Sequence, residues 1–161
     1  MKKFTSSSTI NLAASQINLY EWLISMSEND YKNCSKSHKA LGLVTIDNVE
    51  GMINVENLGG QLLIQHYKMI DKHPQHLVLE SLKSDVYLFH LLKVHVQVEW
   101  RMSLKPLTNN SCEFTCQVGV KYPNQFLKMA HMIVGGNYFL AKHTNEEGPL
   151  FANYIEKKFT S

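Results

Sequence analysis

LFHLLKVHVQVEWRMSL, residues 88–104, alternates apolar and polar side chains along most of its length. Every second residue from Leu88 to Leu104 is apolar except His90, and the residues between them are polar or charged from Lys93 onward. A period of two over so long a stretch predicts a strand with one face in a core and the other in water, as is typical of antiparallel sheets.

A second strand of the same kind follows at residues 111–122, where cysteine, valine and aromatic residues alternate with polar ones. Pro106 and the polar residues 108–111 supply a turn, so the two strands are predicted to form a long hairpin. Turn-forming residues separate the other expected strands, which are 5–12, 38–46, 52–55, 61–70 and 75–82.

Two short helices are expected after the first strand. Ser15 is predicted to cap a helix that carries Tyr20 and Leu23, and a second helix is expected over Ser27–Cys34.

The C-terminal part changes to a period of 3.6 residues from Asn124 onward, which predicts a long helix. The pairs 135–136 and 148–149, Gly-Gly and Gly-Pro, are expected to kink or break it. Thr144 and Glu147 fit a capping box that would restart the helix after such a break.

This order of elements contains no βαβ alternation and predicts an α+β fold. We expect one domain, residues 1–161, in which a curved antiparallel sheet of about six or seven strands wraps a long C-terminal helix. Such an arrangement encloses a cavity lined mainly by apolar side chains, so the expected partner is a small apolar or aromatic ligand.

The composition of the chain indicates which classes of partner and which cellular compartment to expect. The net charge is only +2 and the lysines are scattered, which argues against nucleic acid. No stretch is apolar enough for a membrane span, and the first residues do not resemble a signal peptide. The three cysteines are not spaced to pair, which favours a reducing compartment and hence the cytoplasm. The oligomeric state stays open, with a homodimer as one assembly to consider.

His90 is the one ionisable residue on the otherwise apolar face of the longest predicted strand. In a cavity it could serve as a ligand anchor, a metal ligand or a general base. The alternative is a core histidine that is hydrogen-bonded to a carbonyl or a tyrosine.

Aromatic and thioether side chains are candidates for the cavity wall, because they fill irregular apolar space and stack on flat ligands. The alternative for each of them is a place in the ordinary core. These candidates are Trp22, Trp100, Met102, Phe114, Met129 and Tyr138.

The order of elements, together with the stretch IDKHPQHLVLE at residues 70–80, resembles the helix-grip superfamily of START-related lipid-transfer and polyketide-cyclase proteins (SRPBCC). The resemblance covers nearly the whole chain and implies an internal cavity. It does not decide whether chemistry takes place there.

A narrower resemblance is to the zinc-dependent diacetylphloroglucinol hydrolases, which cleave a carbon–carbon bond in an acylated phenol. It rests on the stretch from Trp22 to His38, on INVENLGG at residues 53–60 and on AKHTNEE at residues 141–147. The resemblance implies that His38, Glu56 and His143 hold zinc.

The chain departs from that family on the long penultimate strand, where Trp100 lies near the place of a further histidine. Each proposed ligand also has a structural alternative: His38 at a strand start, Glu56 on an exposed turn and His143 facing water. The acidic pair 146–147 could orient His143 or cap a helix.

Three functions follow as alternatives. The first is a zinc-assisted, hydrolase-like activity on an acyl-phenol or polyketide-like compound, with zinc as the cofactor. The second is a non-catalytic carrier or sensor of a lipid or hydrophobic metabolite. The third is a metal-free cyclase or dehydratase with His90 as general base. No motif of the common hydrolase, nucleotide-binding or dinucleotide-binding classes is present.

Overall fold

A computed structural model of the chain describes residues 1–88, 91–133 and 135–160. Strand β1 (Lys2–Ile10) is followed by a 3-10 turn, η1 (Ala14–Gln16), and by two short helices, α1 (Leu19–Ile24) and α2 (Glu28–Asn33). Six strands come next: β2 (His38–Ile46), β3 (Val49–Leu58), β4 (Gln61–His73), β5 (His76–Leu88), β6 (Leu92–Thr108) and β7 (Ser111–Lys121). Helices α3 (Gln125–Ile133) and α4 (Gly136–Thr160) complete the chain.

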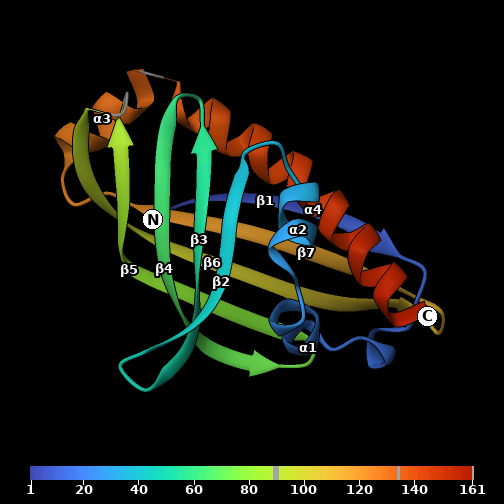
Figure 1. Ribbon diagram of the computed structural model, residues 1–161. Helices are drawn as coiled ribbons and strands as arrows, with labels where there is room; N and C mark the ends of the chain where they lie inside the picture. The colour runs from blue at the N-terminus through green and yellow to red at the C-terminus, as the bar shows by residue number, and fades with distance from the viewer. Residues whose placement is uncertain (89–90, 134, 161) are drawn as a thin grey trace.

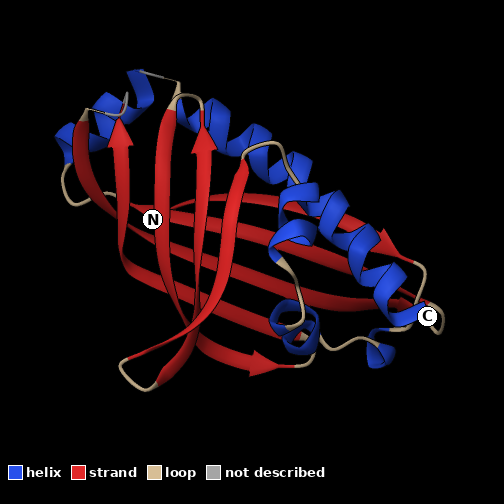
Figure 2. Cartoon of the chain, viewed as in Figure 1, coloured by secondary structure: helices blue, strands red, loops and turns tan. Residues whose placement is uncertain are grey.

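All seven strands form one antiparallel sheet in the order β1-β7-β6-β5-β4-β3-β2. The sheet bends strongly, so that the β2–β4 part stands steeply across the part formed by β6, β7 and β1, and α4 lies along its concave side (Figures 1 and 2). Register shifts interrupt the β4–β5 and β5–β6 pairs, and bulges of this kind increase local bending and twist. The predicted α+β helix-grip fold is confirmed.

The long hairpin predicted from the alternating pattern is present as β6 and β7. Inward residues from Val96 to Leu104 are buried while their neighbours are partly exposed, and β7 follows the same rule from Cys112 to Val118. Both ends of the first strand differ from the prediction. Leu88 ends β5 and pairs with Leu92, the first residue of β6, and β6 continues through Pro106, which was expected in the turn, to Thr108. His90 lies outside the described residues.

The two short helices are present, but the cap of the first one was predicted wrongly. Asn18 caps α1, since its side chain accepts hydrogen bonds from the backbone of Tyr20 and Glu21. The second helix begins as predicted, with Ser27 and Asp30 forming a capping box.

The long C-terminal helix is interrupted once within its described part. Gly135 has a φ of 74° and separates α3 from α4, as the Gly-Gly pair predicts. Helix α4 continues through Pro149, so the expected restart at Thr144 does not occur. The hydroxyl of Thr144 instead donates to the carbonyl of Leu140, one turn back. Gly148 allows close approach to β1, because a Cβ atom there would lie 2.5 Å from Ser6 Oγ.

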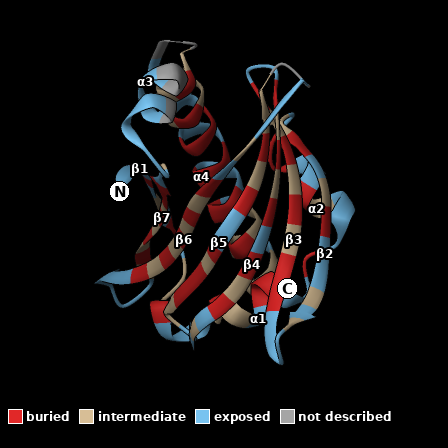
Figure 3. Cartoon of the chain, turned by 90° about the vertical axis from the view of Figure 1, so that its left-hand side faces the viewer, coloured by how far each residue is buried: buried red, intermediate tan, exposed pale blue. Residues whose placement is uncertain are grey.

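The core lies between the concave face of the sheet, α4 and the two short helices, and buried positions alternate along the strands (Figure 3). At its centre Trp22 meets Phe151 of α4 edge-on, with ring centroids 5.3 Å apart. Among the described residues, no helix combines the length and apolar character that crossing a membrane requires.

Candidate functional site

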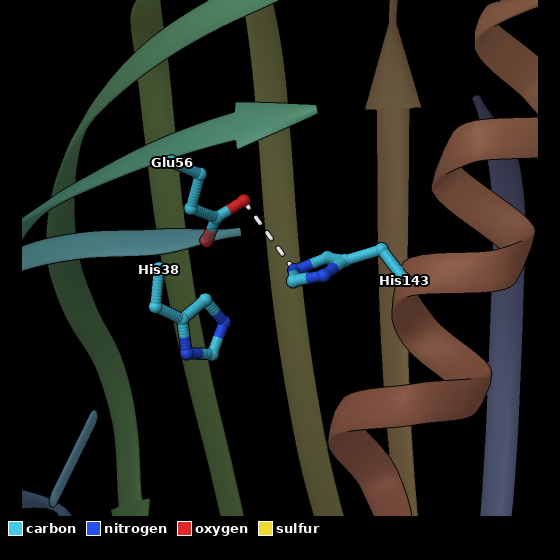
Figure 4. A group of neighbouring side chains, drawn as sticks. All are labelled: His38, Glu56 and His143. Carbon is cyan, nitrogen blue, oxygen red and sulfur yellow. Dashed lines mark ion pairs between the residues drawn. The ribbon is translucent and has the colours of Figure 1, made fainter. Parts of the chain in front are cut away.

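Three residues from distant parts of the chain meet at the inner side of the sheet. His38 begins β2, Glu56 lies opposite it in the register of β3, and His143 projects from α4. One potential ligand atom of each lies within 4.8 Å of the others, and all three side chains are buried, so the group could hold a metal ion. Figure 4 shows Glu56 and His143 facing each other, with His38 alongside.

Both imidazoles are oriented by their Nδ1 atoms. His38 Nδ1 lies 2.6 Å from the backbone carbonyl oxygen of Tyr31, which accepts its proton. His143 Nδ1 lies 3.4 Å from Ser35 Oγ. Each ring therefore turns its Nε2 atom into the site, and neither Nε2 has a hydrogen-bond partner among the described residues. A partner on the second nitrogen is the usual arrangement around metal-binding histidines.

Glu147 is the residue of the site that the sequence reasoning assigned no firm role. Its Oε2 atom lies 3.3 Å from His38 Nε2 and 3.2 Å from His143 Nε2. Its side chain is buried, so it is neither a helix cap nor a solvent-facing acid. The spacing of four residues from His143 placed both on one face of a helix, and this was the available signal.

Two neutral side chains hold the carboxylate of Glu56 in place. Tyr31 Oη donates to Glu56 Oε1 at 2.7 Å, and Asn54 Nδ2 donates to the same oxygen at 2.9 Å. Asn54 Nδ2 also donates to Tyr31 Oη at 2.8 Å. Glu56 Oε2 remains directed at His143 Nε2, 3.5 Å away. Glu56 is therefore a buried carboxylate with a fixed orientation. The alternative prediction from the sequence, an exposed residue on a turn, is wrong.

The opposite charges of His143 and Glu147 shift each other's pKa so that both groups are ionised near neutral pH. Burial by itself lowers the pKa of His143, but the carboxylates of Glu147 and Glu56 outweigh it and raise that pKa to about 9. Burial acts to raise the pKa of Glu147, and the two histidines overcome it and lower that pKa to about 2. Without a metal, the site is therefore a buried ion pair at neutral pH.

This polar group forms one end of a cavity between the sheet and α4. Apolar side chains make most of the wall, with Tyr67 and Trp100 among the larger ones, while Glu56, His143 and Glu147 form its polar end. Leu88, Tyr122 and Phe139 line the cavity and are partly exposed, so they mark its mouth. The free volume is about 60 Å³, below the ~150 Å³ of a cavity that admits benzene. An aromatic ligand would therefore have to displace side chains at the mouth.

The candidates for the cavity wall separate into three groups. Trp100 lines the cavity, and its Nε1 donates to Cys116 Sγ at 3.2 Å. Trp22, Met102 and Phe114 are buried in the core away from the cavity lining. Met129 and Tyr138 are 61% and 66% exposed, so the structure does not place them in the wall. Both residues lie near the break at Gly135, Met129 in α3 and Tyr138 in the first turn of α4.

Comparison with known proteins by sequence gives no match, either to a family model or to a curated protein. Comparison of structures does give matches. A START superfamily protein from Mycobacterium smegmatis has a TM-score of 0.52 and 14% identity, over 97% of this chain and 98% of that one. An aromatase/cyclase from a Streptomyces species has a TM-score of 0.54 and 9% identity, over 99% and 93%.

A di-domain aromatase/cyclase of the steffimycin biosynthetic pathway has a TM-score of 0.60 and 10% identity. It is matched over 99% of this chain and 52% of its own, so this chain corresponds to about half of it. At these identities the likeness concerns the fold. The chain has the helix-grip fold that these START superfamily and aromatase/cyclase structures share.

Proposed function

We propose that the protein binds a small, largely apolar molecule in the cavity and that zinc held at its inner end assists hydrolysis of an acyl-phenol or polyketide-like compound. The observation that carries the proposal is the convergence of two imidazole Nε2 atoms, of His38 and His143, with the carboxylates of Glu56 and Glu147 in one buried group. Among the described residues neither Nε2 atom has a partner with hydrogen-bond geometry, although both lie within ion-pair distance of Glu147.

The donor set and its spacing support zinc. Zinc binds nitrogen and oxygen donors at about 2.0–2.2 Å, so donors at the corners of a tetrahedron lie about 3.3–3.6 Å apart. Glu147 Oε2 lies 3.2 Å from His143 Nε2 and 3.3 Å from His38 Nε2, and Glu56 Oε2 lies 3.5 Å from His143 Nε2. The ligand atoms of His38, Glu56 and His143 all lie within 4.8 Å of one another. His38, Glu56 and His143 would hold the metal, and Glu147 supplies a further oxygen. Trp100 lies near the strand position where the hydrolases that this chain resembles have a further histidine, and Glu147 on α4 would supply a donor in place of that histidine.

Bound zinc would supply a Lewis acid for a ligand carbonyl or for a water molecule. The chain itself would place the ligand's apolar part against the valine-rich wall and its carbonyl at the polar end. Burial of the acids and imidazoles keeps bulk water from them, which strengthens their electrostatic effect on a bound group.

A second candidate is a metal-free carrier. The ion pair between His143 and Glu147 brings opposite charges together without a metal, and the fold matches include a START superfamily protein. The cyclase alternative with His90 as general base stays a prediction from the sequence, as does the homodimer. Three buried free cysteines support the cytoplasm as the compartment.

The test is hydrolysis of an acylated phenol such as 2,4-diacetylphloroglucinol, followed by chromatography. We expect activity that a chelator removes and zinc restores, and no activity in His143→Ala. His66→Ala is the matched control, because His66 is exposed on the outer face of β4. Binding of the compound without turnover in zinc-loaded protein would favour the carrier.

A further inference from the structure

Beside the proposed metal group, the cavity wall carries two carboxamides that have unused hydrogen-bonding capacity. Asn54 on β3 and Gln65 on β4 are register partners, so their side chains leave the sheet on the same face. Both line the cavity, and they are only 2% and 4% exposed. Oδ1 of Asn54 and Oε1 of Gln65 are buried without a hydrogen-bond partner among the described residues.

The orientation of Asn54 follows from its neighbours. Its two amide protons go to Tyr31 Oη and Glu56 Oε1, so the group facing away from them is the oxygen, which can only accept. Among the described residues no hydrogen bond is recorded for the Gln65 side chain, so its carboxamide oxygen could accept one from a bound group. A buried acceptor without a donor costs about 1–3 kcal/mol, which a ligand with a matching donor recovers.

We infer that Asn54 and Gln65 form a hydroxyl-binding subsite, so that the cavity selects a hydroxylated aromatic ligand over one that carries only alkyl or ether groups. A hydroxyl fits because it donates to a carboxamide oxygen and accepts from an amide. This inference rests on ligand binding in the cavity, as proposed above, but not on the metal.

The position of the pair relative to Glu56 gives the subsite its role. Asn54 precedes Glu56 by two residues on β3, on the same face of the strand. A ligand hydroxyl at the carboxamides would therefore leave an adjacent substituent near Glu56 and His143. The subsite would fix which part of the ligand reaches the polar end and would reject close analogues that lack the donor.

The test compares two ligands of the same ring, resorcinol and its dimethyl ether, by isothermal titration calorimetry. We expect resorcinol to bind the wild-type protein at least about tenfold more tightly, since the ether leaves the buried oxygens unpaired. Gln65→Leu should reduce this preference to about threefold or less while binding of the ether is kept. Gln61→Leu is the control, because Gln61 lines the same cavity from the same strand and is absent from the register pair with Asn54.

The outcomes distinguish the two proposals. Equal binding of both ligands to the wild type would overturn the subsite and leave cavity binding intact, as expected if only water occupies the carboxamides. A preference that persists in folded Gln65→Leu would also overturn it. Binding of neither ligand would contradict cavity binding itself and the subsite with it. Thermal unfolding of each variant confirms that it is folded.

Discussion

Replacing Glu147 with glutamine removes a negative charge from the centre of the site and leaves the side-chain shape almost unchanged. The pKa of Glu147 falls from 4.5 to about 2 on folding. At ~1.4 kcal/mol per pKa unit, the ionised carboxylate stabilises the folded, metal-free protein by about 3 kcal/mol relative to its neutral form. Because the glutamine side chain resembles that neutral form, E147Q should lose about this much stability.

The loss should depend on pH. A folded-state pKa below the unfolded value gives stability that is present above about pH 4.5 and is lost as the pH falls toward 2. The deficit of E147Q should therefore be about 3 kcal/mol at pH 6 and about half of that at pH 3. His143 contributes to the same pair, and its pKa should fall in E147Q because the carboxylate that raises it most is removed.

The assay is urea unfolding of chelator-treated protein at both pH values. For a chain of this length, the deficit at pH 6 corresponds to a melting temperature about 6–12 °C lower. E146Q is the control, since Glu146 is 49% exposed and lies 3.8 Å from Lys142, and it should change stability by less than about 0.5 kcal/mol. Stability of E147Q within about 1 kcal/mol of wild type at pH 6 would refute the buried charge pair.

Three further predictions follow from the same contacts. In the metal-free protein His143 is protonated up to about pH 9, so zinc binding must displace a proton from it. The affinity of the protein for zinc, measured by chelator competition, should therefore rise about tenfold per pH unit between pH 6 and 8. A zinc affinity that does not change with pH would contradict this prediction. Gly148→Ala should lower the free energy of unfolding in urea by about 1–3 kcal/mol, because the added Cβ would lie 2.5 Å from Ser6 Oγ. Gly42→Ala is the control and should be nearly neutral, because a Cβ at Gly42 meets nothing within 4 Å. Equal effects of the two substitutions would be inconsistent with the packing of α4 on β1. Phe151→Ala should cost about 3–5 kcal/mol, since the fully buried ring contacts three aromatic residues, and a cost under about 1 kcal/mol would argue against this core.

The fold could be predicted because the alternation of apolar and polar residues in its two longest predicted strands shows which face of each strand is buried. Val96 to Leu104 and Cys112 to Val118 alternate between core and surface, and this pattern depends only on which face is buried. The break at Gly135 was also visible, because Gly-Gly permits a backbone conformation that other residues rarely adopt. Pro149 was misleading, since α4 accommodates it without ending.

The site was predicted in part, and through resemblance more than through pattern. Nothing in their local sequence brings His38, Glu56 and His143 together, because their meeting depends on the β2–β3 register and on the position of α4. Asn54 and Gln65 were not found, since only the β3–β4 register places them side by side. Met129 and Tyr138 were assigned to the wall by side-chain type, and an aromatic or thioether side chain does not by itself reveal whether its position on a helix faces the core.

Zinc content of untagged protein, measured by elemental mass spectrometry, tests the central claim most directly. We predict close to one zinc per chain in the wild type and in His66→Ala, and little or none in His143→Ala once that variant is shown to be folded. Absence of metal from the wild-type protein even after incubation with zinc, or equal zinc in His143→Ala, would contradict the metal site and leave the metal-free carrier as the function.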